Sequence, residues 1–174
     1  TIDCIWNGFT KSADRLDQYC WTDSYVDNSQ VFVVKADAGI ATQADLAGKS
    51  VCVQVASSAL DALEAEESKD LLDSFKELVQ VEDYQTAFMN LESGAVDAIA
   101  MDVGVAKYQI GTRGDEFVIL DEPLVAEEYA VGFKLGNDEL RDEVQTTLYD
   151  MAADGTLDTI AAKWDLTDSV ILGK

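Results

Sequence analysis

Apolar residues along the chain fall into short runs separated by turn residues, and their spacing alternates between the strand period and the helical period. The clearest strand is Ser50 to Val55, a continuous apolar run that leads directly into the helical spacing of Leu60 and Leu63. Strands that alternate with helices between residues 30 and 120 predict an α/β unit with a largely parallel sheet. Within it we expect these further elements: a strand ending at Lys35 after an Asp27-Asn28-Ser29 turn, strands at Leu78 to Asp83 and Val96 to Met101, and helices at 84–94 and 103–110.

The two ends of the chain have different patterns. The apolar run from Ile2 to Trp6 predicts a short buried strand, and Asn7-Gly8 ends it as a turn. After two extended runs between residues 117 and 136, the remainder is predicted to be helical. Four apolar residues there recur on one face of a helix: Leu140, Val144, Leu148 and Met151.

Composition narrows the possible functions. The 174 residues suffice for one large domain or two small lobes with a real core. A formal net charge of −22 argues against binding to nucleic acid or to an anionic membrane, since both require clustered Lys and Arg. No apolar run is long enough to span a membrane, and no signal peptide precedes the first predicted strand.

Cysteine and histidine usage bears on metal and redox chemistry. The chain has no histidine and lacks metal-ligand spacing, so we expect no metal site and no cofactor. Three cysteines cannot all pair within one molecule. Cys4 and Cys52 lie in strand-like apolar runs, which favours free buried thiols, and a Cys4–Cys20 bridge is the alternative.

Three short segments carry candidate ligand chemistry. Arg15 follows the Asn7-Gly8 turn and the hydroxyls of Thr10 and Ser12, a setting that suits a carboxylate ligand. The alternative is a surface ion pair with Asp14 or Asp17, which contributes little energy.

The other two segments end predicted strands. Ser57 and Ser58 come between a buried strand and a helix, where backbone N–H groups can receive an anion, and either serine can equally cap the helix. Asp102 follows the strand that ends at Met101, where it can receive an ammonium group or cap the next helix.

Six motifs, in order along the chain, together resemble a known family. They are DCIWNGFTKSADR, CWTDSYVDNSQVFVV, DLAGKSVCVQVASSALDAL, LESGAVDAIAMD, EEYAVGF and AADGTLDTIAAKW. Taken together they are similar to the extracellular amino-acid-binding proteins of ABC importers, which are type II periplasmic binding proteins of bacterial solute-binding family 3. The resemblance covers nearly the whole chain.

This resemblance implies an α/β fold of two lobes joined by two crossover strands. Residues 1–25 and 130–174 are expected to form a partial first lobe, and residues 26–129 a second lobe. Arg15 is expected to bind the α-carboxylate of a free amino acid beside Gly8 and Thr10, and Asp102 its α-ammonium group. The resemblance also assigns N–H donors to Ser57 and Ser58, and it places three residues where relatives vary with the ligand side chain: Asn7, Gln54 and Met101. Because Gln54 is uncharged and can both donate and accept, a polar neutral or small ligand is expected rather than a dibasic one.

The chain departs from the family pattern in three places. Ser12 stands where the family has a second threonine, and Ala56 stands where it has a glycine, which can alter the turn and its donors. The family begins with a strand, a helix and another strand that are not seen before Thr1. We therefore expect the remnant of the first lobe to self-associate or rearrange through its uncovered sheet edges, with poor ligand affinity.

The resemblance implies solute capture outside the cytoplasmic membrane, in the periplasm or at a lipid-anchored cell surface, with delivery to a membrane permease of an ABC importer. It implies no enzymatic activity and no nucleic-acid partner. One alternative is a ligand-sensing ectodomain of a receptor. The other is a dehydratase-type enzyme on the same fold, which would need a general acid or base with a tuned pKa.

Overall fold

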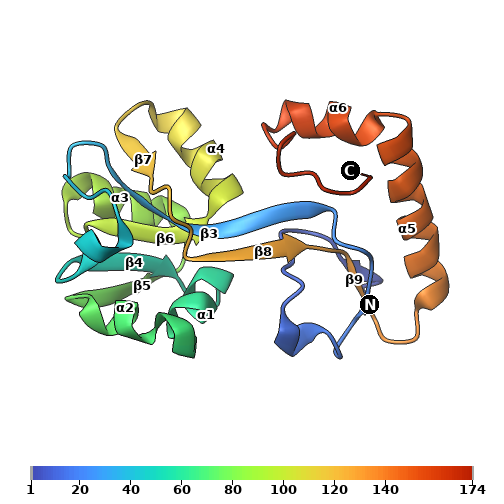
Figure 1. Ribbon diagram of the computed structural model, residues 1–174, viewed down its shortest axis with the longest axis horizontal. Coiled ribbons are helices and arrows are strands. Elements are labelled where there is room, and N and C mark those ends of the chain that lie inside the picture. The colour runs from blue at the N-terminus through green and yellow to red at the C-terminus, as the bar shows by residue number, and fades with distance from the viewer. Residues whose placement is uncertain (1, 174) are drawn as a thin grey trace. The chain divides into compact units, whose positions relative to one another are not determined.

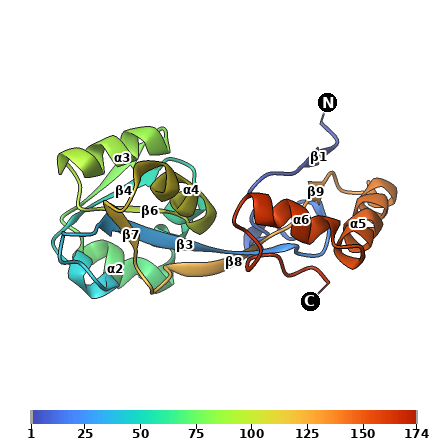
Figure 2. The same cartoon turned by 90° about the horizontal axis from the view of Figure 1, so that it is seen from above.

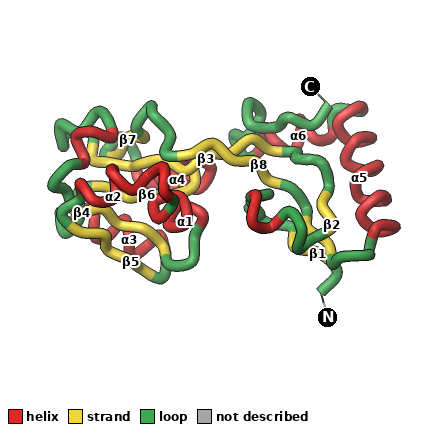
Figure 3. The backbone as a smooth tube through the Cα atoms, turned by 60° about the horizontal axis from the view of Figure 1, so that its bottom comes forward, coloured by secondary structure: helices red, strands yellow, loops and turns green. Residues whose placement is uncertain are grey.

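The computed structural model describes residues 2–173, and in it the chain crosses twice between two units. Unit 1 consists of Thr1–Asn28 and Glu127–Lys174, and unit 2 of Ser29–Ala126. The two connecting segments belong to strands β3 (Val26–Lys35) and β8 (Val125–Tyr129), which pair with each other and are drawn in yellow in Figure 3. The assignment of these units as the two lobes of a binding protein remains a prediction.

Unit 2 is built on a mixed sheet. Its strand order is β5-β4-β6-β3-β7, and the strands other than β3 are β4 (Ser50–Gln54), β5 (Glu77–Val81), β6 (Ala98–Asp102) and β7 (Phe117–Ile119). Strand β4 is parallel to both β5 and β6, whereas β3 is antiparallel to β6 and β7. The expected largely parallel sheet is therefore only half correct, because β3 enters from unit 1 without a preceding crossover helix.

Helices cover both faces of this sheet, as Figure 2 shows. They are α1 (Ser58–Glu64), α2 (Lys69–Ser74), α3 (Tyr84–Ser93) and α4 (Val103–Arg113), together with the 3-10 helices η2 (Gln43–Leu46) and η3 (Glu66–Ser68). Alternate strand residues contribute to different cores: Val33 and Ile99 pack with α3 and α4, and Phe32 and Val53 pack with α1 and α2. Burial on both faces explains why the strands are apolar at consecutive positions.

Unit 1 combines a small sheet with two helices. The sheet has the order β1-β9-β2, formed by β1 (Cys4–Ile5), β9 (Gly132–Phe133) and β2 (Cys20–Trp21). The helices are α5 (Asp138–Ala153) and α6 (Thr156–Lys163), seen at the red end of the chain in Figure 1, and a 3-10 helix, η1, spans Ala13–Arg15. The apolar face expected on α5 is present, since Leu148 packs with Leu157 of α6 and with Val26. None of the helices in residues 2–173 has both the length and the apolarity needed to cross a membrane.

Two local predictions are corrected by the structure. The run from Ile2 to Trp6 is not a buried strand: only Cys4–Ile5 is extended, while Ile2 and Trp6 are 75% and 52% exposed. The reason is that β1 lies at a sheet edge and pairs only with β9. The expected turn at Asp27-Asn28-Ser29 lies instead within β3. Its backbone is held extended by partners far away in sequence, for example by the Asp27 N–H, which donates to the Ser169 carbonyl at 2.7 Å.

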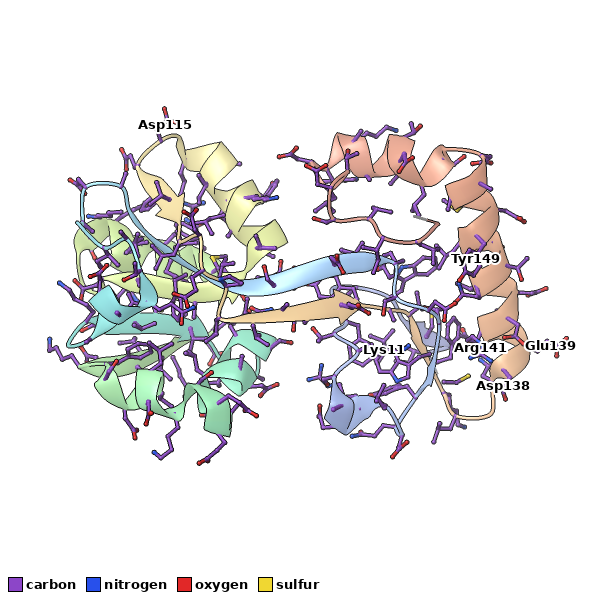
Figure 4. All side chains as sticks on the ribbon, viewed as in Figure 1. Lys11, Asp115, Asp138, Glu139, Arg141 and Tyr149 are labelled. Atoms are coloured by element: carbon purple, nitrogen blue, oxygen red, sulfur yellow. The ribbon has the colours of Figure 1, made fainter. Side chains whose placement is uncertain are left out.

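All three cysteines are free thiols, so the alternative of a Cys4–Cys20 bridge is wrong. Cys4 and Cys20 pair with Phe133 from opposite sides. They are therefore separated by two strand spacings, roughly 9–10 Å, which exceeds the reach of a disulfide of about 7 Å. Cys20 instead donates a hydrogen bond to Asp138 Oδ1 at 3.1 Å, at the end of α5 where Figure 4 labels Asp138 and Arg141.

The close packing around Gly132 generates a first prediction. A Cβ atom on Gly132 would lie 2.7 Å from Cε1 of Phe9, whose ring stacks on Trp21 at 4.8 Å between centroids. Because the Phe9 ring packs against both Trp21 and Tyr19, it has little room to shift. Gly132→Ala should therefore destabilise the protein by about 1–3 kcal/mol in chemical denaturation. The matched control is Gly111→Ala within α4, where nothing lies near the new methyl group. That change should stabilise the protein by about 0.5–1 kcal/mol, and equal effects of the two substitutions would contradict the packing described.

Thiol burial generates a second prediction. Burial raises the pKa of Cys52 to about 11, and its side chain is fully inaccessible, whereas Cys4 is half-buried. Because the thiolate is the reactive form, alkylation of the native protein at pH 8 should modify Cys4 well before Cys52. The raised pKa also means that folding holds this proton more tightly, so the stability contribution of the neutral thiol should be complete below about pH 9 and lost as the pH rises through 11. Mass spectrometry of the alkylated protein tests the order, and simultaneous labelling of both cysteines would refute it.

Candidate functional site

The carboxyl ends of two parallel strands place the predicted polar residues of unit 2 together. The register of β4 and β6 pairs Val53 with Ala100. Gln54, one residue after Val53, and Asp102, two residues after Ala100, are the last residues of their strands and end at the same edge of the sheet. Both residues are half-buried. Ligands of open α/β sheets bind at this carboxyl edge.

The turn between β4 and α1 is held by hydrogen bonds on both sides. Ser57 Oγ donates to the Gln54 carbonyl at 2.8 Å and accepts from the Leu60 N–H at 3.2 Å, so Ser57 is the N-cap of α1. On the other side, Gln54 Nε2 donates to the Glu82 carbonyl at 2.9 Å. Ser58 is the first residue of the helix. Ser57 is therefore engaged in capping, and any ligand contact is added to that role.

Ala56, where the family pattern has glycine, adopts the conformation that glycine favours. Its φ is +52°, one of two non-glycine residues with positive φ in the described chain. An L-residue is strained there by roughly 1–2 kcal/mol. The positive φ is one that a glycine would adopt without strain, and the hydrogen bonds of Gln54 and Ser57 around the turn hold the strained residue in place.

Asp102 ends β6 and begins α4. Its Oδ1 accepts a hydrogen bond from the Val105 N–H at 3.0 Å, which makes Asp102 the N-cap of that helix. In the sheet Asp102 pairs with Gln30 of β3, a polar residue that is 3% exposed. The capping alternative is correct, and it leaves a ligand role possible because a carboxylate can accept several hydrogen bonds at once.

Met101 does not belong to the site that was predicted for it. Its side chain is fully buried in the core cluster that includes Val31 and Cys52. The expectation that Met101 contacts the ligand side chain is corrected for this reason: one residue before the edge of the sheet, both faces are still covered by helices.

In unit 1, the loop that carries the predicted carboxylate-binding residues runs beside β8. Thr10 forms a β-bridge with Tyr129, and the Lys11 N–H donates to the Glu128 carbonyl at 3.0 Å. Thr10 is buried, whereas Asn7 and Gly8 are exposed. A Cβ on Gly8 would lie 3.3 Å from the Tyr129 ring, so the glycine permits the close approach of loop and strand.

Arg15 lies at the end of η1 rather than before a helix, and an aromatic cluster supports it. Its guanidinium carbon lies 5.5 Å from the centroid of the Phe9 ring, in cation–π range. Trp21 Nε1 donates to the Arg15 carbonyl at 3.3 Å, and Phe9, Tyr19 and Trp21 contact one another. Sequence reasoning missed this support, although the aromatic residues at alternate positions 19 and 21 were a usable signal.

Other features of the described residues do not coincide with the predicted site. A cavity of about 460 Å³ in unit 1 lies beside β1 and β9, and it is lined by none of the predicted residues. Within residues 2–173, no group of three or more His, Cys, Asp or Glu side chains is placed to hold a metal ion.

Two α/β units joined by two crossing strands, with polar residues at the carboxyl edge of one sheet, correspond to a binding protein of the type II periplasmic fold. The chain belongs to the bacterial extracellular solute-binding proteins, family 3, whose model matches residues 1–167. This confirms the family predicted from the six motifs. The family consists of solute-binding proteins rather than enzymes.

Individual relatives agree with this assignment. L-cystine-binding protein TcyJ of Escherichia coli (strain K12) is 28% identical over 168 residues, which are 94% of this chain and 60% of TcyJ. A substrate-binding protein of an ABC uptake transporter from Streptococcus pneumoniae, solved with bound histidine, is 27% identical with a TM-score of 0.87, covering 99% of this chain and 71% of that one. An ancestral arginine-binding protein bound to arginine is 31% identical with a TM-score of 0.79, covering 94% and 71%. The chain thus spans about 60% of the length of TcyJ, and a similar share of other curated relatives that it matches.

The strained turn generates a third prediction. Ala56→Gly should stabilise the protein by about 0.5–1 kcal/mol, because relief of the left-handed strain exceeds the added entropy of the unfolded chain. Ala62→Gly, within the adjoining helix α1, is the matched control and should instead cost about 1 kcal/mol. Chemical denaturation measures both, and a loss of stability in Ala56→Gly would show that the turn is not strained.

Proposed function

We propose that this chain binds a free amino acid outside the cytoplasmic membrane and delivers it to the permease of an ABC importer. The observation that carries the proposal is the placement of Asp102 and the Ser57–Ser58 turn at one carboxyl edge of the unit 2 sheet, in a chain of this family. Its relatives are named for binding arginine, cystine and glutamine. Localisation in the periplasm or at a lipid-anchored surface is part of the proposal.

Arg15 is proposed to bind the α-carboxylate of the amino acid. A guanidinium can grip a carboxylate with two parallel hydrogen bonds, and stacking on Phe9 limits the directions in which the side chain can point. Gly8 and Thr10, on the same loop, are proposed to add polar contacts, and Asn7 to lie beside the ligand side chain.

Asp102 is proposed to bind the α-ammonium group, and Ser57 and Ser58 to supply N–H donors to the carboxylate. A zwitterion requires one cation and one anion from the protein, and Arg15 and Asp102 meet that requirement. The Asp102 carboxylate is already oriented by the Val105 N–H, so little freedom is lost when an ammonium group binds.

A fourth prediction tests both charged contacts. In calorimetric titration with the best-binding amino acid, Arg15→Lys should weaken binding by roughly thirtyfold, or about 2 kcal/mol, since lysine cannot form the paired contact. Asp102→Asn should be similarly harmful, because it removes the charge while retaining the shape. Arg141→Lys is the matched control: Arg141 lies on α5, bonded to Asp142 and to the Trp21 carbonyl, and its replacement should leave affinity unchanged.

The ligand can be varied to test the same contacts without altering the protein. An N-acetylated amino acid lacks the ammonium group, and a decarboxylated one lacks the carboxylate. If the N-acetylated analogue binds as well as the parent amino acid, Asp102 has no ammonium role. Equal binding of the decarboxylated analogue would exclude the carboxylate role of Arg15.

A further inference from the structure

We infer that the ligand is an amino acid whose side chain donates hydrogen bonds, such as an amide, an ammonium or a guanidinium group, and that amino acids with a carboxylate side chain are rejected. This inference rests on the proposed function and specifies the ligand class. It depends on the orientation of one amide group, that of Gln54, and on the charges around it.

The contact with Glu82 determines how the Gln54 amide is turned. Its partner is the backbone carbonyl of Glu82, 2.9 Å away, and a carbonyl can only accept a hydrogen bond. The amide nitrogen must therefore be the atom that faces Glu82. Within residues 2–173, the amide oxygen Oε1 receives no hydrogen bond, and Gln54 is half-buried at the carboxyl edge of the sheet.

Gln54 consequently offers a ligand its amide oxygen, which accepts hydrogen bonds, because the amide cannot turn over to offer its nitrogen instead. Turning the amide over would place its oxygen against the Glu82 carbonyl and leave that carbonyl unbonded, at a cost comparable to a lost hydrogen bond. The second hydrogen on Nε2 belongs to a nitrogen held 2.9 Å from the Glu82 carbonyl, whose negative end disfavours an anion at that nitrogen. This differs from the expectation of a polar neutral or small ligand rather than a dibasic one, which treated Gln54 as able to donate; as an acceptor, Gln54 also suits the charged donors of a dibasic ligand.

The charges at the ends of the strands favour the same class of ligand. Glu82 and Asp83 follow β5, and Asp102 ends β6, so the carboxyl edge carries three acidic residues. The lysines adjoining these strands lie at the opposite edge: Lys49 precedes β4, Lys76 precedes β5 and Lys35 ends the antiparallel strand β3. A side-chain carboxylate at the carboxyl edge would be repelled without a compensating cation on that edge.

The pair glutamine and glutamate tests the inference directly, because the two side chains have nearly the same shape and differ in donor capacity and charge. Titrating the ¹⁵N-labelled chain with each amino acid and following the Val105 amide and the Gln54 side-chain NH₂ signals by NMR detects even millimolar binding. We expect glutamine to bind at least about tenfold more tightly than glutamate. Equal or tighter binding of glutamate would overturn the inference while leaving the proposed function intact. If none of the twenty amino acids bound, the proposed function would be overturned, and this inference with it.

A substitution at Gln54 tests whether the preference for glutamine over glutamate comes from this side chain or from the overall negative charge of the protein. Gln54→Lys places a donor and a positive charge where the acceptor stands, and it should shift the glutamine-to-glutamate affinity ratio toward glutamate by at least about tenfold. The matched control is Ser93→Lys, an exposed position at the C-terminal end of α3 that adds the same charge to the same unit beside Lys35 at the opposite edge, and there the ratio should stay unchanged. If Gln54→Lys melts at a much lower temperature, Gln54→Met, which has similar size but no strong acceptor, should still abolish the preference for glutamine. An unchanged ratio in a folded Gln54 variant would refute the inference.

Discussion

The parallel pairing of β4 with β6 is the constraint on which the candidate site depends. Both strands are apolar at consecutive positions because helices cover both faces of the sheet, and this burial locks their register. With Val53 opposite Ala100, the first polar residues after the buried segments, Gln54 and Asp102, must emerge at the same edge. The sheet core therefore determines where the polar groups lie, and the turns determine how they are oriented.

Orientation comes from short-range hydrogen bonds that also stabilise the helices. Ser57 closes the turn after β4 and caps α1, and Asp102 caps α4 in the same way. Ala56 keeps its left-handed conformation because the bonded residues on either side leave the backbone no relaxed alternative. An alanine thus occupies, in a left-handed conformation, a position where the family pattern has glycine.

Most strands and helices of unit 2 could be predicted from sequence because their signals are local. Apolar runs located β4 and β6, and Gly94, with φ +76°, ends α3 as its position after the helical pattern indicated. The wrong predictions concern residues whose conformation or burial is determined by partners far away in the sequence. The turn signal at Asp27-Asn28-Ser29 is overridden by strand pairing with residues near 126 and 169. Met101, which the resemblance placed beside the ligand side chain, is buried because residues of α3 and α4 pack against it, and these contacts are not local in the sequence. Likewise, no local pattern shows which way the Gln54 amide is turned, since its partner lies 28 residues away.

Asp102 caps helix α4 and is proposed to bind the ammonium group of the ligand, and these two roles need different properties of its side chain. A helix cap requires an oxygen acceptor but no charge, and asparagine caps about as well as aspartate. Recognition of an ammonium group requires the negative charge itself. Asp102→Asn should therefore retain the bond to the Val105 N–H, and with it most of the stability of α4, while removing the charge. If this variant binds the amino acid more weakly but is as stable as the original protein, the loss of affinity reports on the charge alone. A substitution at a residue without the capping role would not separate charge from structure as cleanly.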